Sequence, residues 1–516
     1  MKSKFVNSDL ASDFDNIMLQ NKEKMSPFMK LFWEEQKKLS KMNTKGNRYH
    51  PMIIRFCLSI ASKSSLAYDE LRSSNILTLP SRRTLRDYKN AITPQTGFNP
   101  AVIDQLLKVV SKAKNYERNI VLSFDEMKIQ QNLVFRKDIN GGELVGFVDL
   151  GDPDLNFATL DKPDELASHV LAFYVTGLTT KLKFELGYMA TKDLRSYQIK
   201  GMFDRALAVL EDTCSLHVMA VVCDGCASNR SFIGMHRPTS KLTGDVIYRT
   251  INLFDKSRWI YFFSDTPHLM KTSRNCMYSS GSGTGKKRLM WNDGKEIVWD
   301  HIMQAHHQQQ NNGLKLIYKL KEEHVYLNPF SKMNVRLATQ VLSETVGKYF
   351  YNYHPPSYHG TAEFCLMMNN FFDIFNIKNT FQYKSTNKPF LKPLSSPNDV
   401  QLKWLKEEFL VYFQKWHESI NNRVGEFSKS DRGKMFLSHQ TYLGIRMNVL
   451  SLIGLTNYLF REKEVQGDID DTQEFLLTGK ISQDSTEENF GRHRAAGRRN
   501  DNPSLHQFGY DSNIIK

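Results

Sequence analysis

The N-terminal part of the chain shows apolar residues at helical spacing, interrupted by short polar breaks. The segment FMKLFWEEQKKLSK carries such a stripe, and three more short helical segments follow it: HPMIIRFCLSIASK, SLAYDELRS and RRTLRDYKN. Residues 1–24 lack this periodicity and are expected to form a polar tail. Several short helices joined by tight turns, the last of them basic, predict a helix-turn-helix region over 25–92.

The last of these predicted helices is rich in basic residues: Arg82, Arg83, Arg86 and Lys89. Because the final helix of a helix-turn-helix can enter the DNA major groove, we expect these four side chains to contact DNA. An ordinary helical subdomain with a solvated basic face explains the same pattern equally well.

From residue 119 onward the periodicity changes from helical to strand-like. Apolar runs occur in NIVLSFDEM, HVLAFYVTGL and FELGYMAT, and after the helical stretch YQIKGMFDRALAVLEDT two further runs, LHVMAVVCDGC and WIYFFSD, carry an Asp at or near their ends. A turn at Asn140-Gly141-Gly142 is expected to close a hairpin. This order predicts an α/β fold whose RNase H-like core has its N-terminal part in 93–265.

Beyond Asp265 the pattern is mainly helical over a stretch that is too long for a connecting loop. We therefore predict a large helical insertion over 266–425. The C-terminal part of the RNase H-like core is then expected in 426–516.

The overall charge of the chain indicates which class of molecule it binds. The 516 residues include 69 Lys and Arg against 55 Asp and Glu, a formal net charge of +14, which indicates a polyanion such as nucleic acid. The sequence has no continuous apolar run of about eighteen residues, so a membrane is not expected as a partner. It also lacks a secretory signal, and its six cysteines are too sparse for a disulfide scaffold, which favours a place inside the cell.

Candidate chemistry lies at the predicted strand ends. Asp125 closes the first strand and Asp224 closes the fourth, so in the predicted sheet both side chains should face one pocket. A third carboxylate, Glu487, follows Asp484 at helical spacing near the C-terminus. Carboxylate oxygens can hold two Mg²⁺ or Mn²⁺ ions, which activate the attack on a phosphodiester. The alternative is that the aspartates cap turns and that Glu487 is a solvated helical residue.

Four strings carry a more specific signal. FDEMKIQ, VVCDGCASN, FFSDTPHLMKTSRN and QDSTEENFGRHR, the last with DNPSLHQF downstream, resemble the signature blocks of P-element-type transposases and their THAP-domain relatives, in the family's order. The resemblance implies that Asp125, Asp224 and Glu487 are catalytic and bind metal, with Asp484 as an auxiliary ligand. It also implies hydrolysis and strand transfer on double-stranded DNA, at transposon ends and target, by a nuclear homodimer or larger assembly.

The resemblance further implies that the insertion binds guanine nucleotide, so that GTP joins Mg²⁺ as an expected cofactor. The stretches concerned are NVRLATQVLS and AEFCLMMNNFFDIFN, with the candidate residues Val335, Ser343, Phe372, Asp373 and Asn376. A carboxylate can accept hydrogen bonds from the guanine N1 and N2 donors, and an aromatic ring can stack on the base. Helical core residues and helix caps would give the same pattern.

Basic residues beside the signature blocks are further candidate DNA contacts: Lys271, Arg492, Arg494, Arg498 and Arg499. The sequence departs from the family in two respects. No counterpart of the THAP zinc finger is evident, since the first cysteine is Cys57, and Thr486 and Asn489 stand where the family has apolar residues. We expect the second departure to weaken the packing behind Glu487. Two alternative functions remain open: a catalytically inactive, domesticated DNA-binding protein, and a guanine-nucleotide-dependent regulator.

Overall fold

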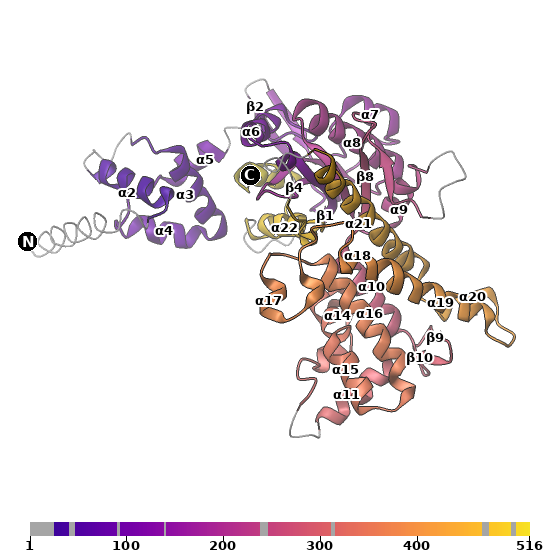
Figure 1. Cartoon of the computed structure of the whole chain (residues 1–516). Helices are drawn as coiled ribbons and strands as arrows, with labels where there is room; N and C mark the ends of the chain where they lie inside the picture. Colours follow the sequence, from indigo (N-terminus) through magenta and orange to yellow (C-terminus); the bar gives the residue numbers. More distant parts are fainter. Residues whose placement is uncertain are drawn as a thin grey trace, which may run out of the picture. The chain divides into compact units, whose positions relative to one another are not determined.

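A computed structural model describes eight stretches of the chain: residues 25–40, 47–89, 93–138, 141–237, 246–310, 315–466, 474–496 and 502–515. The chain forms two compact units (Figure 1). The smaller unit combines 1–94 with 491–516, and the larger unit is continuous from 95 to 490.

The smaller unit is helical. Its helices are α2 (Pro27–Ser40), α3 (Pro51–Lys63), α4 (Ser65–Ser73), α5 (Arg82–Lys89) and α23 (Leu505–Ile515), which packs on α3 and α5. The buried core gathers around Tyr68, whose hydroxyl donates to the Pro80 carbonyl at 2.7 Å. Ser64 caps α4 by accepting a hydrogen bond from the Ala67 main-chain nitrogen. The short helices predicted for this region are therefore present.

A mixed six-stranded sheet forms the centre of the larger unit, in the order β5-β4-β1-β6-β8-β7. The strands are β1 (Asn119–Lys128), β4 (His169–Gly177), β5 (Lys183–Thr191), β6 (His217–Cys223), β7 (Arg249–Ile251) and β8 (Trp259–Ser264). β6 runs parallel to β1 and β8 runs parallel to β6, whereas β4, β5 and β7 pair antiparallel with their neighbours. Residues 120–124 of β1 are buried, which explains why four of these five are apolar. The predicted α/β fold is confirmed.

The predicted hairpin is present but stands apart from this sheet. β2 (Val134–Asp138) and β3 (Gly141–Val145) form a separate two-stranded sheet. The sequence predicts Gly141 and Gly142 in the turn, but in the structure they are the first residues of β3 and pair with Asp138 and Lys137.

One long helix, α21 (His439–Gln466), packs along β8. The Asn448 side chain accepts from the Ser264 main-chain nitrogen and donates to the Ser264 carbonyl, at 2.7 and 2.8 Å. The stretch His439–Phe460 is long and apolar enough to cross a membrane by composition, but 61% of its most apolar window is buried inside the protein. A core helix has these same properties.

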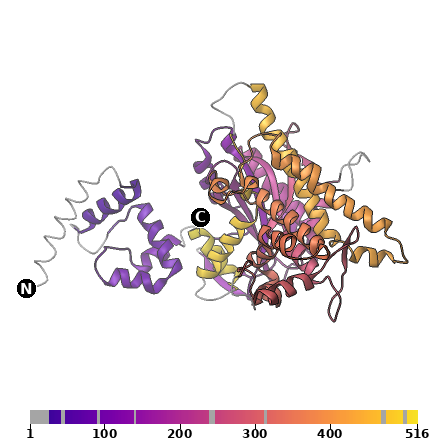
Figure 2. The same cartoon turned by 60° about the horizontal axis from the view of Figure 1, so that its bottom comes forward.

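The other helices beside the sheet are α6 (Pro100–Val110), α7 (Pro153–Thr159), α8 (Ser196–Leu207), α9 (Ala227–Gly234), α10 (Thr266–Tyr278) and α22 (Asp484–Ala496). The segment between α10 and α21 is mainly helical, as predicted, with one small hairpin formed by β9 (Met290–Asn292) and β10 (Lys295–Ile297). Its helices lie together below the sheet in Figure 1 and remain grouped in the turned view of Figure 2. They are α11 (Trp299–Gln310), α12 (Glu322–Val325), α13 (Pro329–Met333), α14 (Val335–Val341), α15 (Glu344–Tyr353), α16 (His359–Phe375), α17 (Gln382–Thr386), α18 (Val400–Trp404), α19 (Leu410–Asn422) and α20 (Lys429–Lys434).

The insertion and the sheet share one hydrophobic core, which runs from Val121 and Tyr261 to Phe364 and Trp416. A buried arginine ties the insertion to the helix after β8. Arg274 of α10 is fully buried and donates to the carbonyls of Ser331 and Lys332 in α13, both at 3.0 Å. The sheet and the insertion therefore pack as parts of one unit.

Candidate functional site

Two of the predicted catalytic residues sit side by side at one edge of the sheet. The parallel pairing of β1 with β6 places Ser123 opposite Val222, and Asp125 and Asp224 each lie two residues farther along. Asp125 does not close the first strand as predicted, because it pairs with Ala172 of β4 and β1 continues to Lys128, whereas Asp224 directly follows β6. Adjacent parallel strands thus carry the two aspartates to the same edge.

The electrostatic environment links Asp125 to the other carboxylates. Burial, followed by the negative charge of Asp224, raises the pKa of Asp125 to about 7. The charges of Glu487 and Asp265 act in the same direction, whereas a hydrogen bond from the Glu126 main-chain nitrogen opposes them. Among the residues that the structure describes, none of the four carboxylates Asp125, Asp224, Asp265 and Glu487 forms a salt bridge with a lysine or arginine.

Asp224 also caps a turn, which is the alternative role that the sequence predicts for it. Its Oδ1 accepts hydrogen bonds from the Cys226 main-chain nitrogen at 3.1 Å and from Asn229 Nδ2 at 2.6 Å. These bonds fix the carboxylate beside the start of α9. The capping role and a place among the clustered carboxylates are therefore compatible.

Glu487 lies in the first turn of α22 and has an exposed side chain. The residue that precedes this helix, Gln483, is buried and donates through Nε2 to the Phe124 carbonyl of β1 at 2.9 Å. Thr486 is also buried, and its hydroxyl is 2.8 Å from the hydroxyl of Ser123. The chain returns after the insertion to place this turn against β1, close to Asp125.

The two polar residues behind Glu487 are only partly paired: among the described residues, the buried Asn489 Oδ1 has no hydrogen-bond partner, so the expectation of weaker packing stays a prediction. Thr486 and Asn489 are both buried, and both have polar partners on the sheet. Thr486 faces Ser123, and Asn489 Nδ2 donates to Glu185 Oε2 of β5 at 2.6 Å. Two buried hydrogen bonds take the place of apolar contacts at these positions.

Asp265, whose role the sequence did not reveal, belongs to the same region. It caps α10 by accepting from the His268 main-chain nitrogen at 2.9 Å and is 2% exposed. Burial raises its pKa to about 6, against the hydrogen bonds from Gln483 and His268. The sequence carries one signal for this residue: the apolar run WIYFFSD ends in Asp265, much as LHVMAVVCDGC has Asp224 near its end.

The other predicted metal ligand, Asp484, forms an ion pair with Lys378 of the insertion at 3.1 Å. As the side chains stand, the described residues include no group of three or more His, Cys, Asp or Glu that could hold a metal ion. The donor set is nevertheless of the right chemistry, because it consists of carboxylate oxygens without basic partners at Asp125, Asp224 and Glu487. By donor type, these three residues fit a hard divalent cation.

Part of the predicted nucleotide set lies together in the insertion. Asp373 of α16 accepts from Asn369 at 3.0 Å and from Lys388 at 2.7 Å, and burial raises its pKa. Asn369 in turn accepts from the Glu344 main-chain nitrogen, next to Ser343, which caps α15. Two hydrogen bonds through Asn369 thus link Asp373 to the start of α15, which Ser343 caps.

The remaining three nucleotide candidates occupy helix ends. Phe372 precedes Asp373 in α16, Asn376 is the C-cap of that helix, and Val335 is the first residue of α14. Among the residues described, no hydrogen bond ties Val335 to Asp373.

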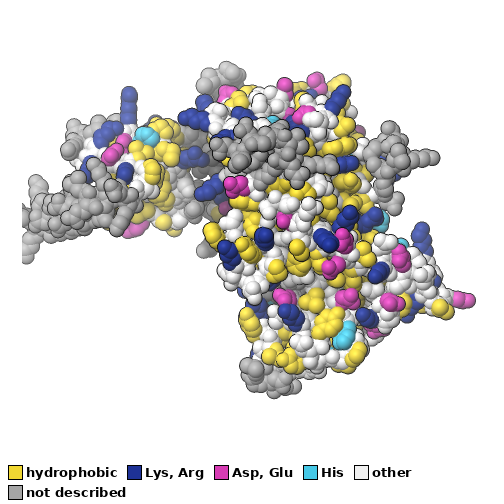
Figure 3. All heavy atoms as spheres, viewed as in Figure 1, with side chains coloured by type: hydrophobic (Ala, Val, Ile, Leu, Met, Phe, Trp, Pro, Cys, Tyr) yellow, Lys and Arg dark blue, Asp and Glu magenta, His cyan; other side chains and the backbone are white. Residues whose placement is uncertain are grey.

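The predicted DNA contacts differ in burial and in their partners. Arg82 is engaged within the smaller unit, where it donates to Asp69 and to the Ser65 carbonyl. Arg83 and Arg86 of α5 and Arg492 and Arg494 of α22 are exposed, and Lys271 of α10 is half-buried. The side chain of Lys89 and residues Arg498 and Arg499 lie outside the described part of the chain. On the face of the larger unit shown in Figure 3, Lys and Arg side chains are scattered among Asp and Glu.

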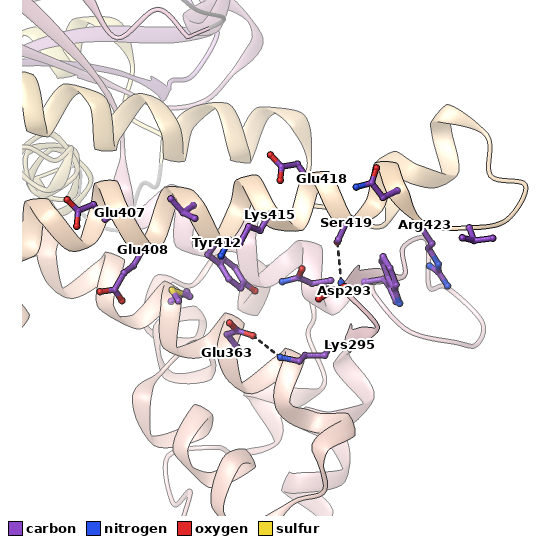
Figure 4. A pocket seen from close by; sticks show the side chains of 16 residues that line it. Asp293, Lys295, Glu363, Glu407, Glu408, Tyr412, Lys415, Glu418, Ser419 and Arg423 are labelled. Carbon is purple, nitrogen blue, oxygen red and sulfur yellow. Dashed lines mark hydrogen bonds and ion pairs between the residues drawn. The ribbon is translucent and has the colours of Figure 1, made fainter.

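A separate groove of about 1030 Å³ lies in the insertion, between the β9–β10 hairpin, α16 and α19 (Figure 4). Its walls carry charges of both signs, including the ion pair of Lys295 with Glu363 at 3.6 Å and the side chains of Glu408 and Lys415. This mixed lining does not select one class of ligand. The groove contains none of the residues predicted for catalysis or nucleotide binding.

Comparison with known proteins gives two matches to domain families. Residues 94–236 match the family "TNP-like, RNase H N-terminal domain", and residues 267–389 match "TNP-like, GTP-binding insertion domain". The transposable element P transposase of Drosophila melanogaster is 25% identical over 500 residues, which cover 93% of this chain and 56% of that protein. This chain is homologous to the P-element transposases.

A second P-element transposase relative is the DNA transposase THAP9 of Homo sapiens, 25% identical over 458 residues, covering 86% of this chain and 45% of that protein. The chain thus spans about half the length of the curated relatives it matches. A solved structure, the Drosophila P element transposase strand transfer complex, matches with a TM-score of 0.70 at 22% identity, over 98% of this chain and 97% of the other. That match supports the fold described above.

Proposed function

We propose that this chain is the catalytic body of a P-element-like DNA transposase, which hydrolyses phosphodiester bonds at transposon ends and joins them to target DNA. The observation that supports the proposal is the neighbourhood of three carboxylates: Asp125 in β1, Asp224 directly after β6 and Glu487 in the first turn of α22. Burial, followed by the repulsion of the neighbouring carboxylates, raises the pKa of Asp125, which is the environment expected of carboxylates that act together on a cation. Homology to transposases supports the same reaction class.

The three carboxylates would hold Mg²⁺ or Mn²⁺. When bound, a pair of these ions activates the attacking oxygen and stabilises the leaving oxygen of an in-line displacement at phosphorus. Neighbouring groups orient the carboxylates by hydrogen bonds. The Glu126 main-chain nitrogen donates to Asp125, and the Cys226 main-chain nitrogen and the Asn229 side chain donate to Asp224. Water and then a DNA 3′-hydroxyl would use this one site, so the protein needs no covalent intermediate. Joining two ends implies at least two copies of the chain, acting in the nucleus where the DNA lies.

The proposal includes guanine-nucleotide binding by the insertion, supported by the match of residues 267–389 to a GTP-binding insertion family. Asp373 would accept hydrogen bonds from the guanine edge, and Phe372 would contribute an aromatic face. Val335, Ser343 and Asn376 would line the same site. Lys388 now pairs with Asp373, so a bound guanine would replace that ion pair.

The test is divalent-cation-dependent nicking and strand transfer on a supercoiled plasmid. Asp125→Asn, Asp224→Asn and Glu487→Gln should each lower activity by at least about a hundredfold while DNA binding in a mobility-shift assay is retained. Glu488→Gln is the matched control, because Glu488 neighbours Glu487 on α22 but pairs with Lys183 at 2.8 Å. Full activity in any of the three variants would contradict the assignment of that residue. An inactive native protein that still binds DNA would favour the domesticated DNA-binding protein.

A further inference from the structure

A single buried carboxylate contacts three elements at the end of the sheet. Asp265 accepts at Oδ2 from the His268 main-chain nitrogen of α10 and at Oδ1 from the Gln483 main-chain nitrogen at 3.1 Å. Its own main-chain nitrogen donates to the Cys223 carbonyl at 3.0 Å, one residue before Asp224. Asp265 therefore joins the end of β6, the start of α10 and the residue that leads into α22.

Gln483 extends this connection to the other two proposed catalytic elements. Its side chain donates to the Phe124 carbonyl, one residue before Asp125, and its own carbonyl accepts from the Glu487 main-chain nitrogen at 2.9 Å. Asp265 and Gln483 are 2% and 3% exposed, so water does not compete for these bonds. Each of the three proposed metal ligands is thus next to, or bonded to, a group held by Asp265 or Gln483.

Two further contacts of this helix are also polar. Thr486 and Asn489 follow Gln483 at intervals of three residues and bond to Ser123 and Glu185. An apolar interface allows a helix to rotate or slide by small amounts, whereas hydrogen bonds restrict both the distance and the angle. A helix that must hold a carboxylate at a set distance from two others gains from this restriction.

We infer that Asp265 and Gln483 are positioning residues that set the place of Glu487 relative to Asp125 and Asp224. This inference rests on the proposed function. An aspartate is needed at 265 because a carboxylate can accept from two main-chain nitrogens at once, at a geometry where an asparagine would direct its NH₂ group toward one of them. Neither residue is proposed to touch the DNA.

The experiment compares Gln483→Met and Asp265→Asn with the native full chain. Gln483→Met keeps the length of the side chain but removes the donor to Phe124, so it should fold even if Asp265→Asn does not. Binding of Mn²⁺ alone, measured by electron paramagnetic resonance, should weaken by roughly tenfold in both variants, as is typical when groups that orient metal ligands are lost. The kcat of plasmid nicking should fall by a similar factor while KM for DNA stays unchanged.

The control is Ser451→Ala, which removes equally buried hydrogen bonds from α21 to the Tyr248 and Phe262 carbonyls. It should lower stability but leave Mn²⁺ affinity unchanged. Native-like Mn²⁺ binding and kcat in Gln483→Met, together with loss of both in Glu487→Gln, would overturn this inference and leave the proposed function standing. Native-like Mn²⁺ binding in Glu487→Gln itself would overturn both.

Discussion

Replacing Thr486 by valine should destabilise the start of α22. Thr486 and Ser123 are both 0% exposed, and their hydroxyls are 2.8 Å apart. Valine has nearly the shape of threonine, so no cavity forms, but the Ser123 hydroxyl keeps only a 3.4 Å contact with the Tyr174 carbonyl. Leaving a buried hydroxyl poorly paired costs about 1–3 kcal/mol.

The same reasoning predicts that a second substitution reverses most of this loss. Ser123→Ala removes the stranded hydroxyl, and replacing both partners of a buried hydrogen bond by apolar groups is close to neutral. The double variant should therefore be more stable than Thr486→Val alone, and the two substitutions should couple by roughly 1 kcal/mol or more.

Hydrogen exchange of the peptide that covers the start of α22 is a suitable assay, because it reports local opening. A cost of about 1–3 kcal/mol corresponds to exchange that is roughly 5 to 150 times faster in Thr486→Val, since about 1.4 kcal/mol is a factor of ten. Unchanged exchange in Thr486→Val would refute the reasoning. So would a double variant that exchanges faster than the single one.

Three further predictions concern charge, packing and nucleotide. The pKa of Asp125 is raised from 3.8 to about 7 in the folded protein. Between these two pH values the unfolded chain releases the proton and the folded protein keeps it, so the stability of the folded protein falls as pH rises from about 4 to about 7. Asp125→Asn should thus gain in Tm over the native protein as pH rises through that range, and a constant difference would contradict the shift. Arg274→Ala should lower the free energy of unfolding by about 2–4 kcal/mol, because it leaves the Ser331 and Lys332 carbonyls unpaired and creates a cavity; native-like urea unfolding would disprove this. Asp373→Ala should weaken GTP binding by about tenfold or more but leave ATP binding unchanged, measured with fluorescent nucleotides, whereas an equal effect on both would remove Asp373 from the guanine edge.

The positions of the two aspartates could be predicted from the sequence because the pattern around them is local. An apolar run that ends in Asp predicts a buried strand with a carboxylate at its end, and two such strands in an RNase H-like order place Asp125 and Asp224 at one edge. Glu487 needed the family resemblance, since its own surroundings are those of any exposed helical carboxylate. The helical nature of the insertion followed from its periodicity in the same way as the strands.

Only the tertiary structure decided which distant residues meet. The bond from Gln483 to Phe124 spans 359 residues, and that from Gln483 to Asp265 spans 218, so no local pattern predicts either. The buried pairs of Thr486 with Ser123 and of Asn489 with Glu185 join residues 363 and 304 positions apart. Likewise, the pairing of Arg82 with Asp69 and of Asp373 with Lys388 depends on the helices that carry them. Periodicity is set by neighbours along the chain and can be read from the sequence, whereas a hydrogen bond across the fold depends on how the whole chain closes around its core.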